Sequence, residues 1–165
     1  FEIDNFFKIP EPLIQKNFSR IMSLKDGLKK MSKSDVSDLS RINLTDTKDQ
    51  IINKIKKAKT DTLPLPETVA ELEKRPEAKN LIGIYSSLTD TNLEKNIMDF
   101  SGKKFSEFKD NLSQVLVDKI VPISTEIKKL LNEKKYLDEI LYNGSEKADK
   151  IASKKIKKIH EIVGF

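Results

Sequence analysis

The chain has 165 residues, 37% of them hydrophobic and 35% charged, with a formal net charge of +5. This balance is typical of a helix-rich globular protein and excludes a disordered one. The absence of cysteine excludes disulfides, thiolate chemistry and cysteine-ligated zinc. The positive excess favours an acidic partner such as RNA, but with 26 acidic residues it is moderate, and solubility alone also accounts for it. No apolar run is long enough to cross a bilayer.

The first 18 residues mix apolar and charged side chains and are predicted to be connecting structure. Pro10 and Pro12 prevent a continuing helix or a central strand in this segment. The chain begins at Phe1 without an initiator methionine, and charged residues interrupt its first apolar positions, so no signal-peptide pattern is present. We therefore expect this chain to be a piece of a longer protein.

The next segment, residues 19–24, alternates polar and apolar side chains and predicts a short strand. Asp26-Gly27 follows as a turn signal. The chain then reads Lys30-Met31-Ser32-Lys33-Ser34, which we call the clamp loop. Two ammonium groups and two hydroxyls at fixed spacing are suited to hold phosphate oxygens, and Lys25 and Lys29 raise the local positive potential. The sequence therefore predicts a loop that binds a polyanion.

After the clamp loop, apolar residues recur at the spacing of helices. Ile51, Ile55 and Ala58 predict a helix from Asp46 to Lys59, capped by Thr45 or Asp46. The lysines at positions 54, 56 and 57 lie off its apolar stripe, and we interpret them as a solvated face in preference to a phosphate-facing one. Residues 60–66 contain two prolines and are predicted to form a loop.

The remainder of the chain is predicted to be helical. Helices are expected over residues 77–88, from Asp90 or Thr91 to Phe100, and over 105–130, the last with a bend near Asp118 caused by Pro122. A short apolar stripe at residues 136–141 is expected to end at Asn143-Gly144. A separate final helix follows from Ser145.

This final helix has one apolar and one basic face. The apolar face carries Ala148, Ala152, Ile156, Ile159 and Val163, and the opposite face carries Lys147, Lys150, Lys154, Lys157 and Lys158. We call the five lysines the basic stripe, a candidate RNA contact. The competing interpretation is solubility, with Glu146, Asp149 and Glu161 pairing with part of the stripe.

Several of these segments together resemble class I aminoacyl-tRNA synthetases. The clamp loop, preceded by residues 19–24, looks like the second signature of that class. Three further motifs narrow the resemblance to the carboxy-terminal half of bacterial or organellar tryptophanyl-tRNA synthetases: Arg41-Ile42-Asn43-Leu44-Thr45-Asp46, Lys59-Thr60-Asp61 and Arg75-Pro76-Glu77-Ala78-Lys79-Asn80-Leu81. The family's first signature, of His-Ile-Gly-His type, and its tryptophan pocket lie upstream and are absent from these residues.

The resemblance implies a mainly α fold: a helical bundle domain preceded by the last strand and signature loop of a Rossmann-type α/β catalytic domain. Residues 1–45 would form the edge of the catalytic domain, and residues 46–165 the helical domain that binds tRNA on the anticodon side. Lys30 and Lys33 would be catalytic, because they would neutralise charge on the departing pyrophosphate. The implied ATP-binding residues are Ile21, against the adenine ring, and Lys30, Met31, Ser32, Lys33 and Ser34.

The implied reaction joins L-tryptophan to ATP, giving tryptophanyl-adenylate and pyrophosphate, and transfers tryptophan to tRNA(Trp). ATP would act with Mg²⁺, and no metal ligated by the protein is expected. The resemblance further implies a homodimer formed through the absent half, no membrane association, and a cytoplasmic location or, alternatively, a mitochondrial or other organellar matrix. The isolated chain is expected to be inactive. Two alternatives remain: a tyrosyl-tRNA synthetase of the same subclass, and a non-catalytic helical RNA-binding module suggested only by basic charge and helicity.

Overall fold

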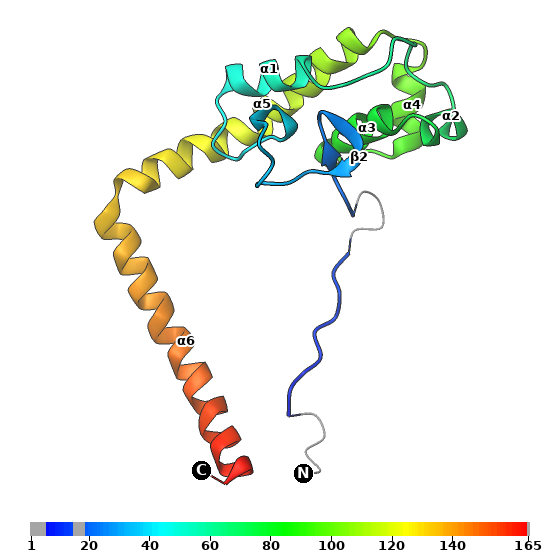
Figure 1. Ribbon diagram of the computed structural model, residues 1–165. Coiled ribbons are helices and arrows are strands. Elements are labelled where there is room, and N and C mark those ends of the chain that lie inside the picture. Colours follow the sequence, from blue (N-terminus) through cyan, green and yellow to red (C-terminus); the bar gives the residue numbers. More distant parts are fainter. Residues whose placement is uncertain (1–5, 15–18, 165) are drawn as a thin grey trace. The chain divides into compact units, whose positions relative to one another are not determined.

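The computed structural model describes residues 6–14 and 19–164, and Figure 1 shows that helices dominate it. In chain order the elements are β1 (Met22–Ser23), β2 (Asp26–Lys30), a 3₁₀ turn η1 (Asp38–Ser40), α1 (Lys48–Lys56), α2 (Val69–Glu73), α3 (Pro76–Thr89), α4 (Leu93–Phe100), α5 (Phe105–Asn132) and α6 (Lys134–Val163). The chain divides into two compact units, Ile14–Glu126 and a unit that joins Phe1–Leu13 with Ile127–Phe165. The predicted mainly α fold is confirmed.

The first unit begins with a hairpin and not with the single strand predicted over residues 19–24. β1 pairs antiparallel with β2, in a register that places Met22 opposite Lys30 and Ser23 opposite Asp26. The turn falls at Leu24 and Lys25, where the Ser23 hydroxyl accepts a hydrogen bond from the Lys25 amide at 3.2 Å. Asp26-Gly27, predicted as the turn, starts β2 instead, because the glycine is needed for packing.

Gly27 lies directly against the first residues of α3. A Cβ atom built on it would be 2.6 Å from the carbonyl carbon of Pro76 and 2.6 Å from the amide nitrogen of Glu77, closer than real Cβ contacts. Pro76 is the first residue of α3, a position where its missing amide hydrogen is not needed. The close approach of β2 to α3 therefore requires glycine at position 27.

Hydrogen bonds attach the rest of the hairpin to its surroundings. The buried side chain of Asn80, on α3, donates to the carbonyl of Met22 at 2.8 Å and accepts from its amide at 2.9 Å. The turn residue Leu24 donates its amide to Ser40 at 2.9 Å and accepts from the Lys59 amide at 2.7 Å. The Leu24 side chain is buried in the same core as the helices. Residues on both sides of position 45 thus share one core.

The core of this unit contains residues from α1, α3, α4 and α5. The rings of Tyr85, Phe100 and Phe108 pack together, with centroids 4.9 Å apart between the two phenylalanines and 5.3 Å apart between Tyr85 and Phe100. Of these rings Phe108 is fully buried, and large aliphatic side chains that are also fully buried include Leu24, Ile51, Ile55, Leu65, Leu72, Leu81, Ile82 and Leu112. Most come from the predicted apolar stripes, so helical periodicity identified this core correctly.

Lys109 of α5 is a buried cation in this unit. Its ammonium group donates to the carbonyls of Ala58 at 2.6 Å and Lys56 at 3.3 Å and to the Thr60 hydroxyl at 3.3 Å. These acceptors follow the carboxy-terminal end of α1, where positive charge is favourable. Burial lowers the pKa of Lys109. The contact attaches α5 to the end of α1.

Two of the predicted helix caps are wrong. α1 is capped by Thr47, whose hydroxyl accepts from the Gln50 amide while the Gln50 side chain accepts from the Thr47 amide, a capping box. The predicted caps Thr45 and Asp46 lie outside it, and Asp46 binds Lys54 instead. α4 is capped by Asn92, because Asp90 adopts the left-handed conformation that ends α3.

The segment between α1 and α3 is mostly irregular, as predicted, but the short helix α2 was not expected. Arg75 stabilises the irregular part of this segment: it donates through Nε to Asp61 at 2.8 Å and through Nη1 to the carbonyl of Pro64 at 2.6 Å. Lys59 forms an ion pair with Glu77 at 2.9 Å. The motifs at residues 59–61 and 75–81 therefore hold this segment against the start of α3.

The second unit contains α6, and here a prediction of two helices is wrong. α6 continues through Asn143-Gly144 to Val163 and ends at Gly164, which has a φ of 84°. A glycine in an exposed helix costs only about 1 kcal/mol, which thirty helical residues tolerate. The amphipathic pattern is present, but no described residue of α6 is buried. The bend near Asp118 in α5 stays a prediction.

Exchanging Gly27 for alanine tests the close contact between β2 and α3. We expect Gly27→Ala to lower the free energy of unfolding by about 1 to 3 kcal/mol, because backbone atoms of α3 must move. Gly144→Ala is the matched control, since nothing lies within 4 Å of the added Cβ, and it should raise stability by about 0.5 to 1 kcal/mol. Chemical denaturation of both variants measures this, and equal effects would contradict the packing argument.

Candidate functional site

A pocket of about 860 Å³ opens beside the end of the hairpin in the first unit. Three segments line it: residues just before the hairpin, the end of β2 with the clamp loop, and residues that follow η1. The lining residues are Ser19, Arg20, Ile21, Lys30, Met31, Ser32, Lys33, Arg41, Ile42, Asn43 and Leu44. Five of the six predicted nucleotide-binding residues, all except Ser34, thus lie at one pocket.

Backbone and hydroxyl contacts shape the clamp loop. The Met31 amide donates to the carbonyl of Ile21 at 3.1 Å, which extends the pairing beyond β1 and β2. The Ser32 and Ser34 hydroxyls lie 3.0 Å apart, and the Ser34 amide donates to the Ser32 hydroxyl at 3.3 Å. Ser34 is therefore linked to the pocket through Ser32. Met31 is partly buried against the core.

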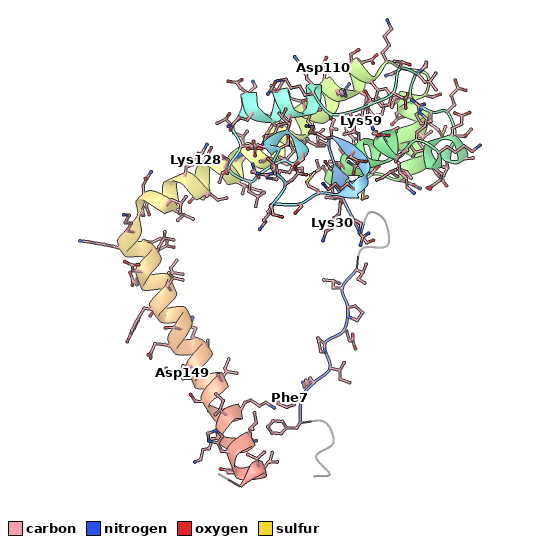
Figure 2. The ribbon with its side chains drawn as sticks, in the orientation of Figure 1. Phe7, Lys30, Lys59, Asp110, Lys128 and Asp149 are labelled. Atoms are coloured by element: carbon pink, nitrogen blue, oxygen red, sulfur yellow. The ribbon has the colours of Figure 1, made fainter. Side chains whose placement is uncertain are left out.

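The two lysines of the clamp loop carry charges that are unpaired within the described residues. Lys30 and Lys33 are exposed, and within the described residues neither ammonium group has a hydrogen bond or an ion pair. Figure 2 labels Lys30 at the end of the hairpin. By contrast, Lys29 lies 3.9 Å from Asp35, and Lys25 lies 3.5 Å from the Ser37 hydroxyl. Two free cations at a pocket can meet an anionic ligand.

The pocket also contains residues that sequence reasoning did not select, notably Arg20, Arg41 and Asn43. Arg41 donates through Nε to the Asn43 side chain at 3.1 Å, and through Nη1 to the carbonyls of Asp35 at 3.0 Å and Ser37 at 3.4 Å. The motif at residues 41–46 was the available signal. Its polar residues have no periodicity that would show which of them face the clamp loop.

Arg41 belongs to a cluster of charged residues with Asp38, Asp46 and Lys54. This cluster shows that the prediction of Lys54 as a solvated residue is wrong. The Lys54 side chain is only 3% exposed, and its ammonium group lies 2.6 Å from a carboxylate oxygen of Asp46 and 2.8 Å from one of Asp38. Asn43 donates to Asp38 at 2.9 Å and to Asp46 at 3.2 Å. The hydrogen bond from Lys54, followed by that from Asn43, lowers the pKa of Asp38. The solvated-face interpretation holds for Lys56 and Lys57, which are exposed.

All five lysines of the basic stripe lie on α6 in the second unit, and all are exposed. Figure 2 shows side chains projecting along the length of this helix. Within the described part of the chain, none of the five forms a salt bridge, and Glu146, Asp149 and Glu161 form none either. Asp149 instead accepts a hydrogen bond from Ser153 at 3.1 Å. Internal pairing of the stripe is therefore not observed.

Residues 6–14 and 19–164 contain neither a cluster of metal ligands nor a membrane-spanning helix. No group of three or more His, Cys, Asp or Glu side chains there is arranged to hold a metal ion. None of the helices in that part of the chain is both long and apolar enough to span a membrane.

Comparison with known proteins identifies the family. Residues 2–119 match the family described as tRNA synthetases class I (W and Y). The chain belongs to this family. It is 47% identical to a tryptophan–tRNA ligase of Mesorhizobium japonicum, over 99% of this chain and 46% of that protein. It is 46% identical to one of Caulobacter vibrioides, over 100% of this chain and 48% of that protein.

Solved structures agree with this assignment. A tryptophanyl-tRNA synthetase from Mycoplasma pneumoniae superposes with a TM-score of 0.75 and 25% identity, over 92% of this chain and 45% of that chain. One from Campylobacter jejuni, complexed with ADP and tryptophane, gives a TM-score of 0.67 at 24% identity, over 99% of this chain and 49% of that chain. The chain thus spans about half the length of the relatives it matches.

The lowered pKa of Asp38 predicts how its contribution to stability depends on pH. The carboxylate is favoured in the folded chain, so its contribution is complete above the unfolded-state pKa of about 3.9 and is lost as the pH falls through the lower folded-state pKa. We expect Asp38→Asn to be less stable than the original chain at pH 6 to 7 and the difference to shrink toward pH 3. Urea denaturation across this range measures it, with the exposed Asp110→Asn as control. A difference that stays constant with pH would contradict the prediction.

Proposed function

We propose that this chain is the carboxy-terminal half of a tryptophan–tRNA ligase, which activates tryptophan with ATP and transfers it to tRNA(Trp). One observation carries the proposal: the unpaired ammonium groups of Lys30 and Lys33 stand at a pocket of a class I synthetase family member. In this proposal residues 1–45 belong to the catalytic domain and residues 46–165 to the tRNA-binding domain. The first supplies the clamp loop, and the second supplies the basic stripe.

The proposed chemistry requires stabilisation of negative charge. The carboxylate of tryptophan attacks the α-phosphate of ATP, the bond to the bridging oxygen breaks, and pyrophosphate leaves with the electrons of that bond. Lys30 and Lys33 stabilise the charge that grows on the leaving group, because fixed cations at a pocket interact most strongly with charge as it develops. No covalent bond to the protein forms in this step.

The remaining residues of the pocket are suited to the other parts of ATP. Ile21 and Met31 supply apolar surface for the adenosine, and the hydroxyls of Ser32 and Ser34 supply hydrogen-bond donors for phosphate oxygens. Magnesium would supply further neutralisation of the phosphates. Because the described residues offer no cluster of three metal ligands, we propose that the ion reaches the site bound to the nucleotide.

Among the alternatives, tyrosyl specificity is disfavoured, because the relatives named above, at 46 to 47% identity, are tryptophan–tRNA ligases. The non-catalytic RNA-binding module is disfavoured by the family match across the hairpin and clamp loop. We propose a cytoplasmic enzyme, consistent with its bacterial relatives, with the organellar matrix as the alternative. We also propose that it is a homodimer whose interface lies in the half absent from this chain.

Replacing the lysines of the clamp loop tests the proposed mechanism. In the longer ligase, Lys30→Ala or Lys33→Ala should slow adenylate formation by about 10²-fold, about 3 kcal/mol, with a smaller effect on tryptophan binding. Tryptophan-dependent exchange between ATP and pyrophosphate measures the rate. Lys57→Ala, at the exposed C-cap of α1, is the control for general loss of charge. Unchanged exchange in both clamp-loop variants would refute their assignment to the leaving group.

The chain of 165 residues by itself should not activate tryptophan. One phosphate-binding loop cannot orient both reactants, and the family's first signature and amino-acid pocket are absent from these residues. Purified chain and longer ligase, assayed side by side for tryptophan-dependent exchange, test this. Exchange by the chain alone would overturn the expectation.

The basic stripe is proposed to bind the phosphate backbone of tRNA. Its five lysines are exposed along one helix, and none is neutralised by an ion pair in the described part of the chain. Such a row follows phosphates without reading bases, so it strengthens binding to all tRNAs and leaves discrimination to other residues.

Salt dependence separates RNA binding from solubility. Each phosphate contact in a single-stranded region contributes about 0.7 to the slope of affinity against salt, so replacing Lys150, Lys154 and Lys157 by glutamine should flatten it by roughly 2. The control replaces Lys48, Lys74 and Lys95, which are exposed on the first unit, so the change in net charge is equal. A titration of tRNA affinity that gives the same slope for both triple variants would leave the stripe as a solvated face.

A further inference from the structure

The clamp loop has little core of its own, and its conformation depends on contacts that follow it in the chain. Lys33 and Ser34 are exposed, and Ser32 is partly exposed. The loop closes at Asp35, whose amide donates to the carbonyl of Ser32 at 3.4 Å and whose carboxylate accepts from the Ser37 amide at 2.8 Å. Whatever fixes residues 35–37 therefore fixes the end of the loop that carries Lys33.

Arg41 is the residue that holds this turn. Its Nη1 donates to the carbonyls of Asp35 and Ser37, its Nε to Asn43, and its Nη2 lies 3.2 Å from Asp38. All three guanidinium nitrogens are thus engaged by the protein. Although Arg41 borders the pocket, these contacts direct Nη1 to the backbone of the turn and the other two nitrogens to side chains of the protein, and so away from a ligand.

Arg41 is in turn fixed by charges that reach the core. Asp38 bridges Arg41 and Lys54, with one carboxylate oxygen 3.2 Å from Arg41 and the other 2.8 Å from Lys54. Lys54 belongs to α1, next to the fully buried Ile51 and Ile55, and its second partner Asp46 is also buried. A continuous set of hydrogen bonds and ion pairs therefore joins α1 to the turn that ends the clamp loop.

We propose that Lys54 and Arg41 are positioning residues that hold the clamp loop in register with α1, so that the ammonium groups of Lys30 and Lys33 are placed before ATP binds. The inference rests on the proposed function for its catalytic consequence, although not for its structural one. Neither residue contacts the reacting atoms in this scheme.

The chemistry of the cluster supports a positioning role over a purely stabilising one. A buried ion pair contributes little net stability compared with apolar residues of similar volume, since both charges lose their hydration. It does impose direction, because charge-assisted hydrogen bonds are short and the planar guanidinium of Arg41 presents its donors in a rigid fork. An exposed loop that must present two unpaired cations requires such support, as misplacement by about 1 Å can cost about 10²-fold in rate.

Hydrogen exchange in the chain itself tests the structural part of the inference. The variants are Lys54→Met and Arg41→Gln, with Lys56→Met as a matched control on the exposed face of α1. Backbone amides of residues 31–37 should exchange at least tenfold faster in both variants and be unchanged in the control, while amides of residues 108–116 in α5 stay protected. If Lys54→Met does not fold, Arg41→Gln carries the test. Unchanged exchange of residues 31–37, or a uniform increase over the whole unit, would overturn the inference.

Kinetics in the longer ligase test the catalytic part. We expect Lys54→Met and Arg41→Gln to lower kcat for ATP–pyrophosphate exchange about 10- to 100-fold while the KM for tryptophan changes little. Because Lys54 is buried, its effect cannot come from a lost contact with substrate. Normal kcat in these variants, with Lys30→Ala impaired, would overturn the inference and leave the proposed function intact. No effect of either Lys30→Ala or Lys33→Ala would refute the proposed role of the clamp loop in catalysis, while hydrogen exchange would still decide whether Arg41 and Lys54 order the loop.

Discussion

The contact between β2 and the start of α3 is the constraint on which the candidate site depends. A strand can approach the backbone of a helix this closely only where it has no side chain, and Gly27 meets Pro76 and Glu77 at that point. Asn80, one turn further along α3, binds both backbone groups of Met22. The hairpin is thus fixed to the helical core on both strands, and the clamp loop leaves it from a defined position (Figure 1).

Two pairs of lysines in the first unit have different physical roles. Lys54 and Lys109 are buried, and each ammonium group is supplied with acceptors: carboxylates for Lys54, and the carbonyls and hydroxyl that follow α1 for Lys109. Lys30 and Lys33 are exposed and unpaired within the described residues. Burying a charge without partners is prohibitive, whereas leaving one unpaired in water costs little. The unpaired lysines at the pocket are therefore the ones available to a polyanion.

In the second unit the amphipathic pattern of the sequence is present, but it does not correspond to burial. α6 carries the predicted apolar and basic faces, but the structure buries none of its described residues. Within the part of the chain that the structure describes, the basic stripe forms no ion pair. The chain matches about half the length of each of these relatives. In our proposal α6 therefore belongs to a longer protein, in which other residues or the tRNA can contact its two faces.

The sequence by itself determined the helical class, most of the core and the composition of the clamp loop, because apolar periodicity and a short motif are local properties of the chain. Tertiary structure alone decided which charged residues are buried and which residues contact one another across the fold. Helical periodicity places Lys54 on a solvated face, but in the structure it is buried and paired with two carboxylates from outside its helix. Gly27 looks like a turn residue in the sequence because the α3 residues that it contacts lie about fifty positions away and do not enter the local pattern. The role of Arg41 likewise depends on carbonyl groups whose direction only the folded backbone sets. Local sequence patterns predict the helices and the clamp loop, whereas contacts between residues far apart in sequence decide which side chains are buried and which lie together at the site.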